Sequence, residues 1–582
     1  MKNIHISIDG IKLEVPGNIT VLQAAREAKI DIPTLCYLKG INEIGACRIC
    51  LVEIKGIKGL QASCVYPVSE GLVVTTNSEN IRQARRTTLE LILSNHNRSC
   101  LTCIRNLKCE LQALAEKFNI RDLPFEGEQN VYPIESLSPS IIRDNNKCIL
   151  CRRCINVCKN IQQVSVIDTT NRGFKSAIHS PFKMKLSDTP CINCGQCITA
   201  CPVGALQIKD DSDKVWDAIN DKTKHVVCQV APAVRVAIGE EFGYPIGSRV
   251  TKNLIGSLRK LGFDKIFDTN TAADLTIMEE GTELLKRLEN NGPLPLITSC
   301  SPGWIKFCEH NFPEFIPNLS SCKSPQQMFG AILKTYYADK MGIHPKDIVV
   351  VSIMPCTAKK YEAKRKEMGR EGYMDVDIVV TTREIARMIR ESGIDFRNSE
   401  SEHFDHPMGD ASGAGAIFGA TGGVMEAAIR TVHELVTGKP LEEIEINAVR
   451  GTEGIKEANV RIGDKVIRAA VAHGTGNAKK LMKDVQSGKK SYDFIEIMAC
   501  PGGCVTGGGQ PIQPAGVRNW TNLSKERAKA IYEEDRSLSV RKSHENENVK
   551  RLYKEFLGKP GSHIAHELLH THYEPKDNYP EE

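Results

Sequence analysis

Hydrophobic and polar residues alternate in short runs over the first 80 residues of the chain. The segments IHISI (4–8), IKLEV (11–15) and GLVVTT (71–76) have the alternation or the β-branched content of strands. Between them, VLQAAREAK (21–29) places apolar residues three and four positions apart, which is the spacing of one helix face. These patterns predict a small α+β unit over residues 1–80.

A different pattern extends over residues 211–582. Strand-like runs such as DIVVVSI (347–353) and VDIVVT (376–381) are largely apolar, and helical runs such as REIARMIRE (383–391) and ELLKRLEN (283–290) lie near them. Strands and helices mixed in this way predict an α/β domain. We therefore expect a multidomain α+β chain whose largest domain is α/β.

The composition is that of a soluble globular protein. Of 582 residues, 41% are hydrophobic and 25% are charged, and no apolar run is long enough to span a bilayer. The start, MKNIHISIDG, lacks a basic flank followed by an apolar stretch, so we expect a cytoplasmic protein without a membrane anchor. The net charge of +5 says little about partners, because bound anionic clusters would offset it. The sequence has no patch of basic and aromatic residues that would indicate nucleic-acid binding.

The chain has 22 cysteines, many of them in short CxxC spacings. Disulfides are disfavoured in a reducing compartment, and such spacings are typical of metal sites. The first set has the pattern C-x10-C-x2-C-x13-C and consists of Cys36, Cys47, Cys50 and Cys64. It resembles the β-grasp [2Fe-2S] ferredoxin-type domain of the large iron-sulfur subunit of respiratory complex I. Structural zinc is the alternative, but zinc sites usually show two CxxC pairs.

The second set has the pattern H-x3-C-x2-C-x5-C and consists of His96, Cys100, Cys103 and Cys109, within residues 81–125. A zinc knuckle would use the same residue types. The order and spacing resemble the [4Fe-4S] site with one histidine ligand that follows the [2Fe-2S] domain in complex I and in iron-only hydrogenases. A neutral imidazole in place of a thiolate should raise the potential of that cluster.

Residues 126–210 contain two runs of the pattern C-x2-C-x2-C-x3-C. In bacterial two-cluster ferredoxins the fourth cysteine of each run ligates the other cluster. One [4Fe-4S] cubane is therefore predicted on Cys148, Cys151, Cys154 and Cys201, and another on Cys191, Cys194, Cys197 and Cys158.

Three further segments carry cysteine beside glycine or proline: TSCSPGW (298–304), MPCTAKKYE (354–362) and MACPGGCVTGGGQP (498–511). They resemble the three signature motifs of [FeFe]-hydrogenases, and the resemblance, closest to the larger clostridial type, extends over nearly the whole chain. It implies an H-cluster domain over residues 211–582 that catalyses 2H+ + 2e- = H2 reversibly. The alternative is an electron-transfer or H2-sensing protein with low turnover, and a complex I subunit is a weaker one.

The resemblance also implies a cofactor and its ligands. Cys356, Cys500 and Cys504, with one cysteine of the first motif, would hold a [4Fe-4S] cubane, which Cys504 would bridge to a diiron subsite carrying CO, cyanide and an azadithiolate. We expect the triple glycine after Cys504 to let the backbone approach this cofactor. Lys359 would donate a hydrogen bond to a cyanide. The pocket would be lined by Pro232, Ala233, Pro325, Gln326, Met354, Phe418 and Met498.

Protons would reach the cofactor through a chain of side chains. If TIMEEGTELLKR is helical, Glu280, Glu283 and Arg287 share one face of the helix, which by itself would usually be a solvated face. The family resemblance instead implies a route from water through Arg287, Glu283, Ser320 and Glu280 to an active-site cysteine.

The first motif departs from the family pattern, which has two adjacent cysteines, one for proton transfer and one for the cubane. Here the pair is Cys300 and Ser301. Strict alignment makes Cys300 the relay and puts Ser301 in the ligand position, yet a hard alkoxide is a poor ligand for a soft cluster. We favour Cys300 as the ligand, with Ser301 or water as the relay, and Cys308 or Cys322 as other candidate thiols. Ala233 is a second departure, since some relatives have serine there.

Two other patterns are set aside. HELLH (566–570) matches the zincin motif, but it has no recognisable third ligand, and we predict an amphipathic terminal helix. SGAGAIFGATGG (412–423) lacks GxGxxG spacing, so we expect close packing rather than nucleotide binding. The expected partners are a soluble ferredoxin-like electron carrier and the maturation proteins that build the diiron subsite, and we expect a monomer.

Overall fold

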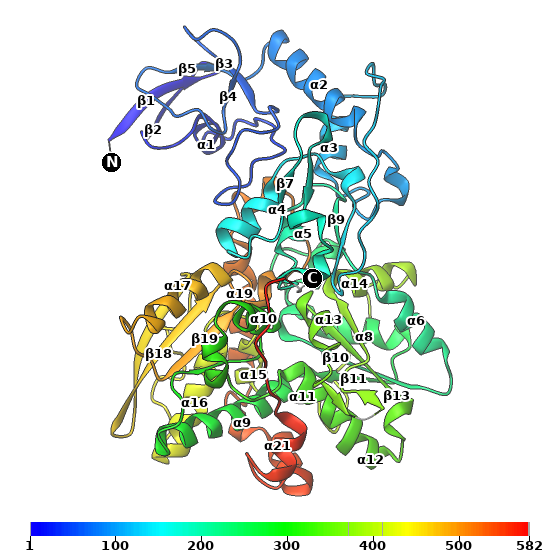
Figure 1. The fold of residues 1–582 in the computed structure, drawn as a ribbon, viewed down its shortest axis with the longest axis vertical. Coiled ribbons are helices and arrows are strands. Elements are labelled where there is room, and N and C mark those ends of the chain that lie inside the picture. Colours follow the sequence, from blue (N-terminus) through cyan, green and yellow to red (C-terminus); the bar gives the residue numbers. More distant parts are fainter. Residues whose placement is uncertain (1, 371, 410, 580–582) are drawn as a thin grey trace.

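The computed structural model describes residues 2–370, 372–409 and 411–579. Figure 1 shows three tiers: a small sheet domain at the top, segments of short helices and strands below it, and a broad lower part formed mainly by residues beyond about 210. No helix among the described residues is long and apolar enough to cross a membrane.

The top tier is a five-stranded sheet with the order β2-β1-β5-β3-β4. Its strands are β1 (Asn3–Ile8), β2 (Ile11–Pro16), β3 (Leu51–Ile54), β4 (Gln61–Ala62) and β5 (Val73–Thr75). Helix α1 (Val21–Glu27) begins at Thr20, whose side chain forms a capping box with Gln23. The strands and the helix predicted for residues 1–80 are therefore observed.

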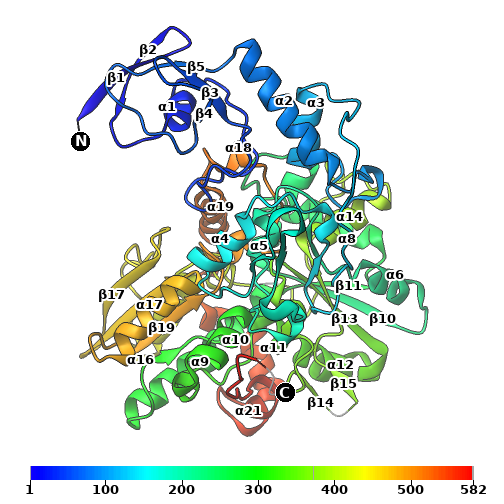
Figure 2. The same ribbon diagram turned by 45° about the horizontal axis from the view of Figure 1, so that its top comes forward.

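The middle tier is built from short elements around the cysteine runs. Strand β6 (Ile141–Arg143) pairs with β9 (Leu206–Ile208), and β7 (Asp168–Thr170) pairs with β8 (Ala177–His179), both antiparallel. The helices are α2 (Glu79–Ser94), α3 (Glu110–Lys117), α4 (Arg153–Asn156) and α5 (Gln196–Ala200). Figure 2 shows α18 (Ala515–Arg518), from the far end of the chain, beneath the N-terminal sheet.

The lower part contains two four-stranded sheets. The first is entirely parallel, with the order β11 (Lys265–Asp268), β10 (His225–Val230), β13 (Ile348–Met354) and β16 (Ile378–Thr381). The second has the order β12 (Leu296–Ile297), β19 (Phe494–Met498), β18 (Lys465–His473) and β17 (Ile455–Ile462), and only β17 is antiparallel to its neighbour. The α/β prediction for this region holds.

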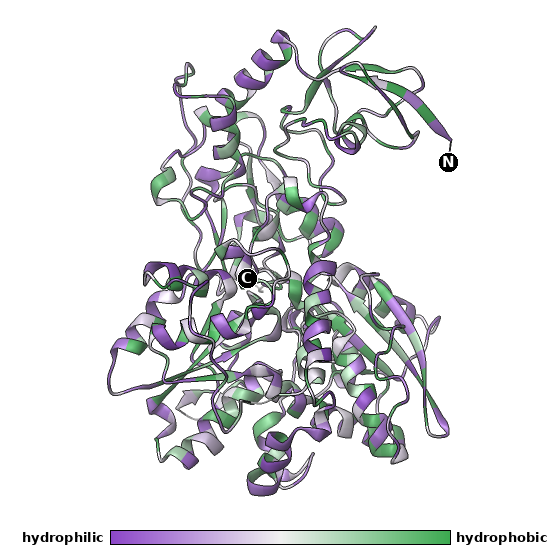
Figure 3. Cartoon of the chain, turned by 180° about the vertical axis from the view of Figure 1, so that it is seen from behind, coloured by the Kyte–Doolittle hydropathy of each residue, from purple (hydrophilic) through white to green (hydrophobic). Residues whose placement is uncertain are grey.

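Helices surround and separate these two sheets (Figure 1). Those that carry or support the site are α7 (Pro232–Arg235), α9 (Thr269–Glu289), α10 (Pro302–Asn311), α11 (Pro325–Ile332), α13 (Ala358–Glu362), α15 (Gly413–Ile417) and α19 (Leu523–Ser537). The others are α6 (Ser212–Asn220), α8 (Thr251–Leu261), α12 (Ala338–Met341), α14 (Thr382–Glu391), α16 (Gly423–Thr437), α17 (Thr475–Gln486), α20 (Glu547–Leu552) and α21 (His563–Leu569). Figure 3 shows purple and green alternating along many of these helices, as expected for helices with one buried face.

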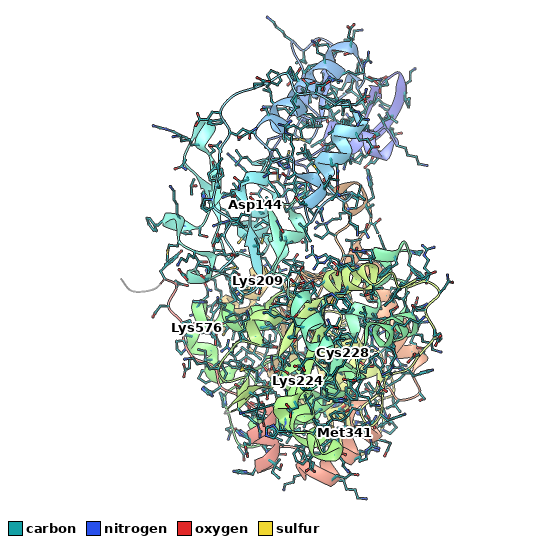
Figure 4. All side chains as sticks on the ribbon, turned by 90° about the vertical axis from the view of Figure 1, so that its right-hand side faces the viewer. Asp144, Lys209, Lys224, Cys228, Met341 and Lys576 are labelled. Atoms are coloured by element: carbon teal, nitrogen blue, oxygen red, sulfur yellow. The ribbon has the colours of Figure 1, made fainter. Side chains whose placement is uncertain are left out.

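Buried strands form the core of the lower part. Five of the six residues of β10 and six of the seven of β13 are buried, which is typical of parallel strands covered on both faces. Cys228 lies within this core on β10 (Figure 4). It is therefore a packing residue of the sheet.

The C-terminal segment returns across the lower part after α21. A β-bridge joins His570 to Cys322, and further along Lys576 N–H donates to the Glu309 carbonyl at 2.9 Å. The amphipathic terminal helix predicted for HELLH is present, with Ala565, Leu568 and Leu569 buried and Glu567 exposed.

Candidate active site

A cavity lies where strands of the two lower sheets end. The residues that follow β10, β11, β13 and β19 all contribute to its wall, as do residues 300–303 after β12. These strands are parallel to their sheet neighbours, and sites in such sheets form outside the carboxyl ends of the strands. Segments that are distant in the sequence therefore meet around one cavity.

This cavity brings together the side chains that the three motifs singled out. It measures about 90 Å³, several times the ~10–15 Å³ that one water molecule requires. Its lining includes Pro232, Ala233, Cys300, Ser301, Pro325, Gln326, Met354, Cys356, Lys359, Phe418, Met498, Cys500 and Cys504. Most of these are apolar or small, so the cavity is a dry site with few polar groups.

Three thiols share the buried wall. Burial raises the pKa of Cys356, Cys500 and Cys504. Nearby negative charge raises each of these pKa values further, and for Cys500 that charge includes the thiolates of Cys356 and Cys504. Thiolates are therefore disfavoured there unless a metal supplies positive charge. A set of three converging soft donors fits an iron-sulfur cluster.

Cys300 and Ser301 have different surroundings. Burial raises the pKa of the Cys300 thiol well above its usual value, and the charges acting on it are those of Glu280, Lys359, Cys504 and Glu496. The Ser301 hydroxyl accepts a hydrogen bond at 3.1 Å from the N–H of Ala499, the residue before Cys500. The influence of Glu280 on Cys300 is the reason for proposing Cys300 as the relay below, and the sequence-based assignment of Cys300 as the ligand stays a prediction.

The other two candidate thiols do not line the cavity. Cys308 is buried in α10, where its thiol donates to the Phe312 carbonyl at 3.4 Å. Cys322 is buried beside Glu283, with its sulfur 4.0 Å from the carboxylate. Neither thiol compensates for the serine in the first motif.

Lys359 is held in place by a residue that the sequence did not single out. The ammonium donates to the Glu362 carboxylate at 2.9 and 3.1 Å and to the Cys300 carbonyl at 3.1 Å. Glu362 in turn accepts from Ser324 and Gln326 at 2.8 and 3.2 Å. The spacing of three residues between a lysine and a glutamate on one helix was the signal that could have revealed this pair.

Hydrogen bonds join the outer members of the predicted proton route. Arg287 donates to Glu283 at 2.6 Å, and the Ser320 hydroxyl donates to the other oxygen of Glu283 at 3.0 Å. Ser320 and Glu283 lie near enough to Glu280 to influence its pKa, and the charge of Glu280 acts on Cys300. All of the acidic members lie on one face of α9, which is a single helix of 21 residues.

Glu280 is the most perturbed acid of this set. Burial, followed by the charge of Glu283, raises the pKa of Glu280 to about 8. The side chain is therefore mainly protonated at neutral pH, and ionises as the pH rises through that value. A group that titrates near neutrality is suited to passing protons.

The triple glycine serves mainly to let protein segments approach one another. A Cβ on Gly508 would lie 2.3 Å from the Cys194 carbonyl oxygen, and one on Gly509 would lie 2.7 Å from the Thr381 Cβ. Of the three, only Gly507 lines the cavity. The expectation that all three glycines make room for a cofactor is thus replaced by close packing against the ferredoxin-like part and β16.

The accessory cysteines gather into the predicted groups. Cys36 lies against Cys47, with backbone N–H to sulfur distances of 3.4 Å in both directions, and Cys50 pairs with Cys64. In the two-run region, electrostatic interactions couple Cys201 to Cys148, Cys151 and Cys154. The same kind of interaction couples Cys158 to Cys191 and Cys194. Cys197 is coupled to Cys158, Cys191 and Cys194. Influences also cross between the runs, from Cys197 to Cys154 and from Cys201 to Cys197, so the exchange of the fourth cysteines stays a prediction.

The predicted ligands around His96 show fewer interactions with one another than the other cysteine groups do. Burial lowers the pKa of His96 to about 4, so the imidazole is neutral, and its buried Nδ1 has no partner among the described residues. The charge of Cys103 acts on Cys109, and Cys103 Sγ lies against Gly204. An orphaned neutral imidazole fits a metal ligand.

One cysteine connects the two regions. Cys194 lines the active-site cavity and also a second cavity that contains Cys158, Cys191 and Cys197. Gln162 and Gln196 fix this junction by donating to the carbonyls of Ala499 and Thr506, both at 2.9 Å. These glutamines were not predicted, and nothing in their spacing marks them.

Comparison with known proteins agrees with this site. The model "Iron only hydrogenase large subunit, C-terminal domain" matches residues 224–508, and "Iron hydrogenase small subunit" matches 521–576. A 2Fe-2S iron-sulfur cluster binding domain matches 1–79, an NADH-ubiquinone oxidoreductase-G iron-sulfur binding region matches 85–124, and a 4Fe-4S dicluster domain matches 147–205. The chain belongs to the iron-only, or [FeFe], hydrogenase family.

Individual relatives are similar over almost the whole chain. NADP-reducing hydrogenase subunit HndD of Solidesulfovibrio fructosivorans is 49% identical over 98% of this chain and 99% of its own. Iron hydrogenase 1 of Clostridium pasteurianum is 44% identical with the same coverages. A structure of [FeFe]-hydrogenase HydA1 from Chlamydomonas reinhardtii has a TM-score of 0.57 and 44% identity, and covers 63% of this chain and 99% of that one.

Proposed function

We propose that this protein is an [FeFe]-hydrogenase that catalyses the reversible reaction 2H+ + 2e- = H2. One observation carries the proposal: a single cavity is lined by Cys356, Cys500 and Cys504, by the ferredoxin-type Cys194, and by Cys300, on which the charge of the buried acid Glu280 acts. Electrons and protons therefore have separate approaches to one site, as the reaction requires. The family membership supports the same conclusion.

Cys356, Cys500 and Cys504 would hold the cubane of an H-cluster, with a diiron subsite carrying CO, cyanide and azadithiolate. When bound, this group supplies the metal centre at which protons, electrons and H2 interconvert. Around it, Lys359 places a positive charge, and Met354, Phe418 and Met498 exclude water. We assign Lys359 as the hydrogen-bond donor to a cyanide because Glu362 fixes its position against the wall.

Electrons would travel through four accessory clusters: one [2Fe-2S] and three [4Fe-4S]. The [2Fe-2S] cluster would lie on Cys36, Cys47, Cys50 and Cys64, and the histidine-ligated cluster on His96, Cys100, Cys103 and Cys109. The dicluster region would hold the remaining two. The cubane on Cys158, Cys191, Cys194 and Cys197 would be the last before the active site, since Cys194 lines both cavities.

Protons would move between solvent and the cavity through Arg287, Glu283, Ser320 and Glu280. Cys300 would complete the route, and Ser301 would face the cubane. Glu283 accepts from Arg287 and Ser320 at once, so it links the outer and inner parts of the chain of contacts. With a pKa of about 8, Glu280 lies close enough to neutrality both to pass a proton toward Cys300 and to regain one through Ser320.

The electron partner would be a soluble ferredoxin-like carrier. A second candidate for the electron source is another subunit of a complex. It is suggested by the relative named as an NADP-reducing hydrogenase subunit, which is 49% identical over 99% of its own length. This chain would then receive electrons within a complex rather than act as a monomer. Maturation proteins would be needed in either case to supply the diiron subsite.

The test is to record infrared spectra and H2 rates on the matured protein beside Cys300→Ala and Ser301→Ala variants. Bands of iron-bound CO and cyanide with turnover are expected in the wild type. Cys300→Ala should keep the bands and lose turnover, whereas Ser301→Ala should alter the bands. A fully matured wild type without bands or turnover would leave an electron-transfer or sensing protein.

A further inference from the structure

A large cavity lies at the start of α8, apart from the active site. It measures about 710 Å³, which is within the ~300–1,000 Å³ typical of small-molecule sites. Its wall is formed by the last residue of α7, the first turn of α8, the last residue of β11, residues 401–404 and residues 534–540. We call it the α8 cavity.

The first turn of α8 offers hydrogen-bond donors that the helix does not use. The helix begins after Val250, and no side chain caps it. Its first internal hydrogen bond runs from the Leu254 N–H to the Val250 carbonyl at 3.0 Å, so the N–H groups of residues 251–253 have no partner within the helix. The positive end of the helix dipole lies at the same place. Such a helix start favours an anion such as a phosphate.

Two cations lie at the rim of the α8 cavity. Arg249 and Lys252 both line it, and both are exposed. Arg249 donates to the Ser537 hydroxyl at 3.2 Å, and neither cation forms an ion pair within the described part of the chain. Glu402 also lines the cavity, but its carboxylate is already paired with Arg259 at 3.2 Å. The rim therefore carries positive charge that no carboxylate offsets.

The inner wall of the cavity holds buried polar atoms that lack partners. Arg235 is only 2% exposed, and it donates to Asp268 at 2.6 and 3.1 Å and to Glu534 at 3.0 Å. Arg235 Nε and Glu534 Oε2 are nevertheless buried without a hydrogen-bond partner among the described residues. Both residues line the cavity. An unpaired buried donor and an unpaired buried carboxylate oxygen are costly, and a ligand with matching groups removes that cost.

The rim and the inner wall together define the chemistry of a ligand. The charge of Arg249 is among those that lower the pKa of Glu534, which burial raises, so the two parts of the cavity lie close together. Phe404 adds an aromatic surface to the lining, with its ring centre 5.0 Å from the Arg235 guanidinium. A nucleoside phosphate has the matching polarity: a phosphate at one end, and hydroxyl and amino donors with ring acceptors at the other.

We propose that the α8 cavity binds a nucleoside phosphate, with the phosphate on the first turn of α8 and the nucleoside against Arg235 and Glu534. The site is separate from the hydrogen chemistry, because no described residue lines both this cavity and the active-site cavity. The two are nevertheless neighbours: Arg235 ends α7, whose first residues Pro232 and Ala233 line the active site. The inference does not depend on the proposed hydrogenase activity.

The probe is AMP, added without oxygen to the full-length protein carrying its iron-sulfur clusters. Isothermal titration calorimetry measures the Kd of AMP, of adenosine and of inorganic phosphate, and hydrogen exchange measures the protection of residues 249–255 by AMP. The test variant is the double substitution Arg249→Gln with Lys252→Gln. The matched control is Lys260→Gln, which removes an exposed lysine at the other end of the same helix. All three side chains are exposed, so the variants should fold.

We expect AMP to bind about tenfold or more tightly than either adenosine or phosphate, and to slow exchange in residues 249–255. The Kd of AMP should rise about tenfold or more in the double variant, which lacks both charged donors, and stay unchanged in Lys260→Gln. No binding of AMP, equal affinity in the double variant and the control, or protection only outside residues 249–255 would overturn the site. Phosphate bound as tightly as AMP would overturn the nucleoside part.

The orientation of the ligand is tested by Glu534→Gln, which keeps the shape of the side chain but removes a carboxylate acceptor. The Kd of AMP should rise about threefold or more in this variant, because the nucleoside loses a hydrogen bond to a charged group. Unchanged affinity would overturn the placement of the nucleoside against the inner wall. If the variant does not fold, the double variant at the rim and the adenosine titration still decide the proposal.

Discussion

At the scale of single residues, burial decides which groups carry charge near the active site. Glu280 and Cys300 are both buried among other acids, and the pKa of each is raised. Lys359 remains close to carboxylate and carbonyl oxygens that stabilise its charge. The surroundings of the cavity therefore combine neutral, proton-holding groups with the Lys359 cation.

Replacing Glu280 by glutamine should lower H2 evolution by about 10²–10⁴-fold, because the amide keeps the shape of the side chain but does not exchange a proton. Infrared bands of the active site should stay as in the wild type. Glu289→Gln, an exposed acid on the same helix, is the control and should leave the rate unchanged. Equal rates in both variants would remove Glu280 from the route.

The protonation of Glu280 can be observed directly. Since the pKa of Glu280 is raised to about 8, the folded protein should show the carbonyl stretch of a protonated carboxyl at pH 7 that fades as the pH rises through about 8. Infrared difference spectra between pH 6 and pH 10 measure this midpoint. The band should be missing in Glu280→Gln at every pH, and its persistence there would assign it to another acid.

At the scale of elements, two neighbouring lysines of α13 have different roles, one at the cavity and one in the core. Lys359 faces the cavity, whereas Lys360 is fully buried and donates to Asp211 at 2.6 Å and Glu384 at 2.8 Å. Asp211 lies next to α6 and Glu384 near the start of α14. This short helix thus joins the site to the framework of the first sheet.

Lys360→Met should destabilise the protein by about 3–5 kcal/mol, because it leaves the buried Glu384 carboxylate without its cation and Asp211 with Lys214 alone. Lys364→Met, at an exposed position of the same segment, should change stability by less than ~0.5 kcal/mol. Urea unfolding followed by circular dichroism measures both. A similar small effect of the two substitutions would show that Asp211 and Glu384 find other partners.

The glycine segment after Cys504 makes a second element-scale prediction. Gly508→Ala should destabilise the protein by about 1–3 kcal/mol and disturb the adjacent cluster, because its Cβ would meet backbone 2.3 Å away. Gly516→Ala, in α18, meets nothing within 4 Å and should be neutral or stabilise by about 0.4–1 kcal/mol. Thermal unfolding and iron content of both variants provide the measurement.

At the scale of the whole molecule, the catalytic part and the electron-supplying part meet through polar contacts at several points, among them Lys39 with Asn519, Ser140 with Thr357 and Arg518 with Thr199. The similar structure from Chlamydomonas reinhardtii covers 63% of this chain but 99% of its own. A catalytic unit of that size therefore exists without the equivalent of the first two tiers. The contacts of Gln162 and Gln196 join those tiers to the cavity.

A fragment of residues 211–582, matured in the same way, should keep the active-site infrared bands and evolve H2 from a reduced viologen dye. It should evolve H2 from reduced ferredoxin far more slowly than the full chain, because the accessory clusters are missing. Rates with both donors, on both proteins, give the comparison. Equal ferredoxin-dependent rates would show that electrons enter the catalytic part directly.

The sequence predicted those features that depend on local spacing. Predicted ligands such as Cys148 and Cys151 lie close along the chain, so their pattern can be read without knowledge of the fold. Spacing placed Glu280 and Glu283 on one helix face, whereas a role in proton transfer came only from the family resemblance. Glu362 lies within the segment MPCTAKKYE, but the sequence analysis did not predict its contact with Lys359. The roles of Gln162, Gln196 and His570 depend on contacts between distant segments, and burial decided the different surroundings of Cys300 and Ser301.

The return of the C-terminal segment has a consequence for the order of biosynthesis. His570 pairs with Cys322 beside Glu283, and Lys576 reaches Glu309 on α10, so residues beyond 563 complete the wall around the proton route. A ribosome finishes the ferredoxin-like tiers several hundred residues earlier. Because domains fold as units during synthesis, those tiers can fold first, whereas the catalytic part is completed only when residues 563–576 have emerged.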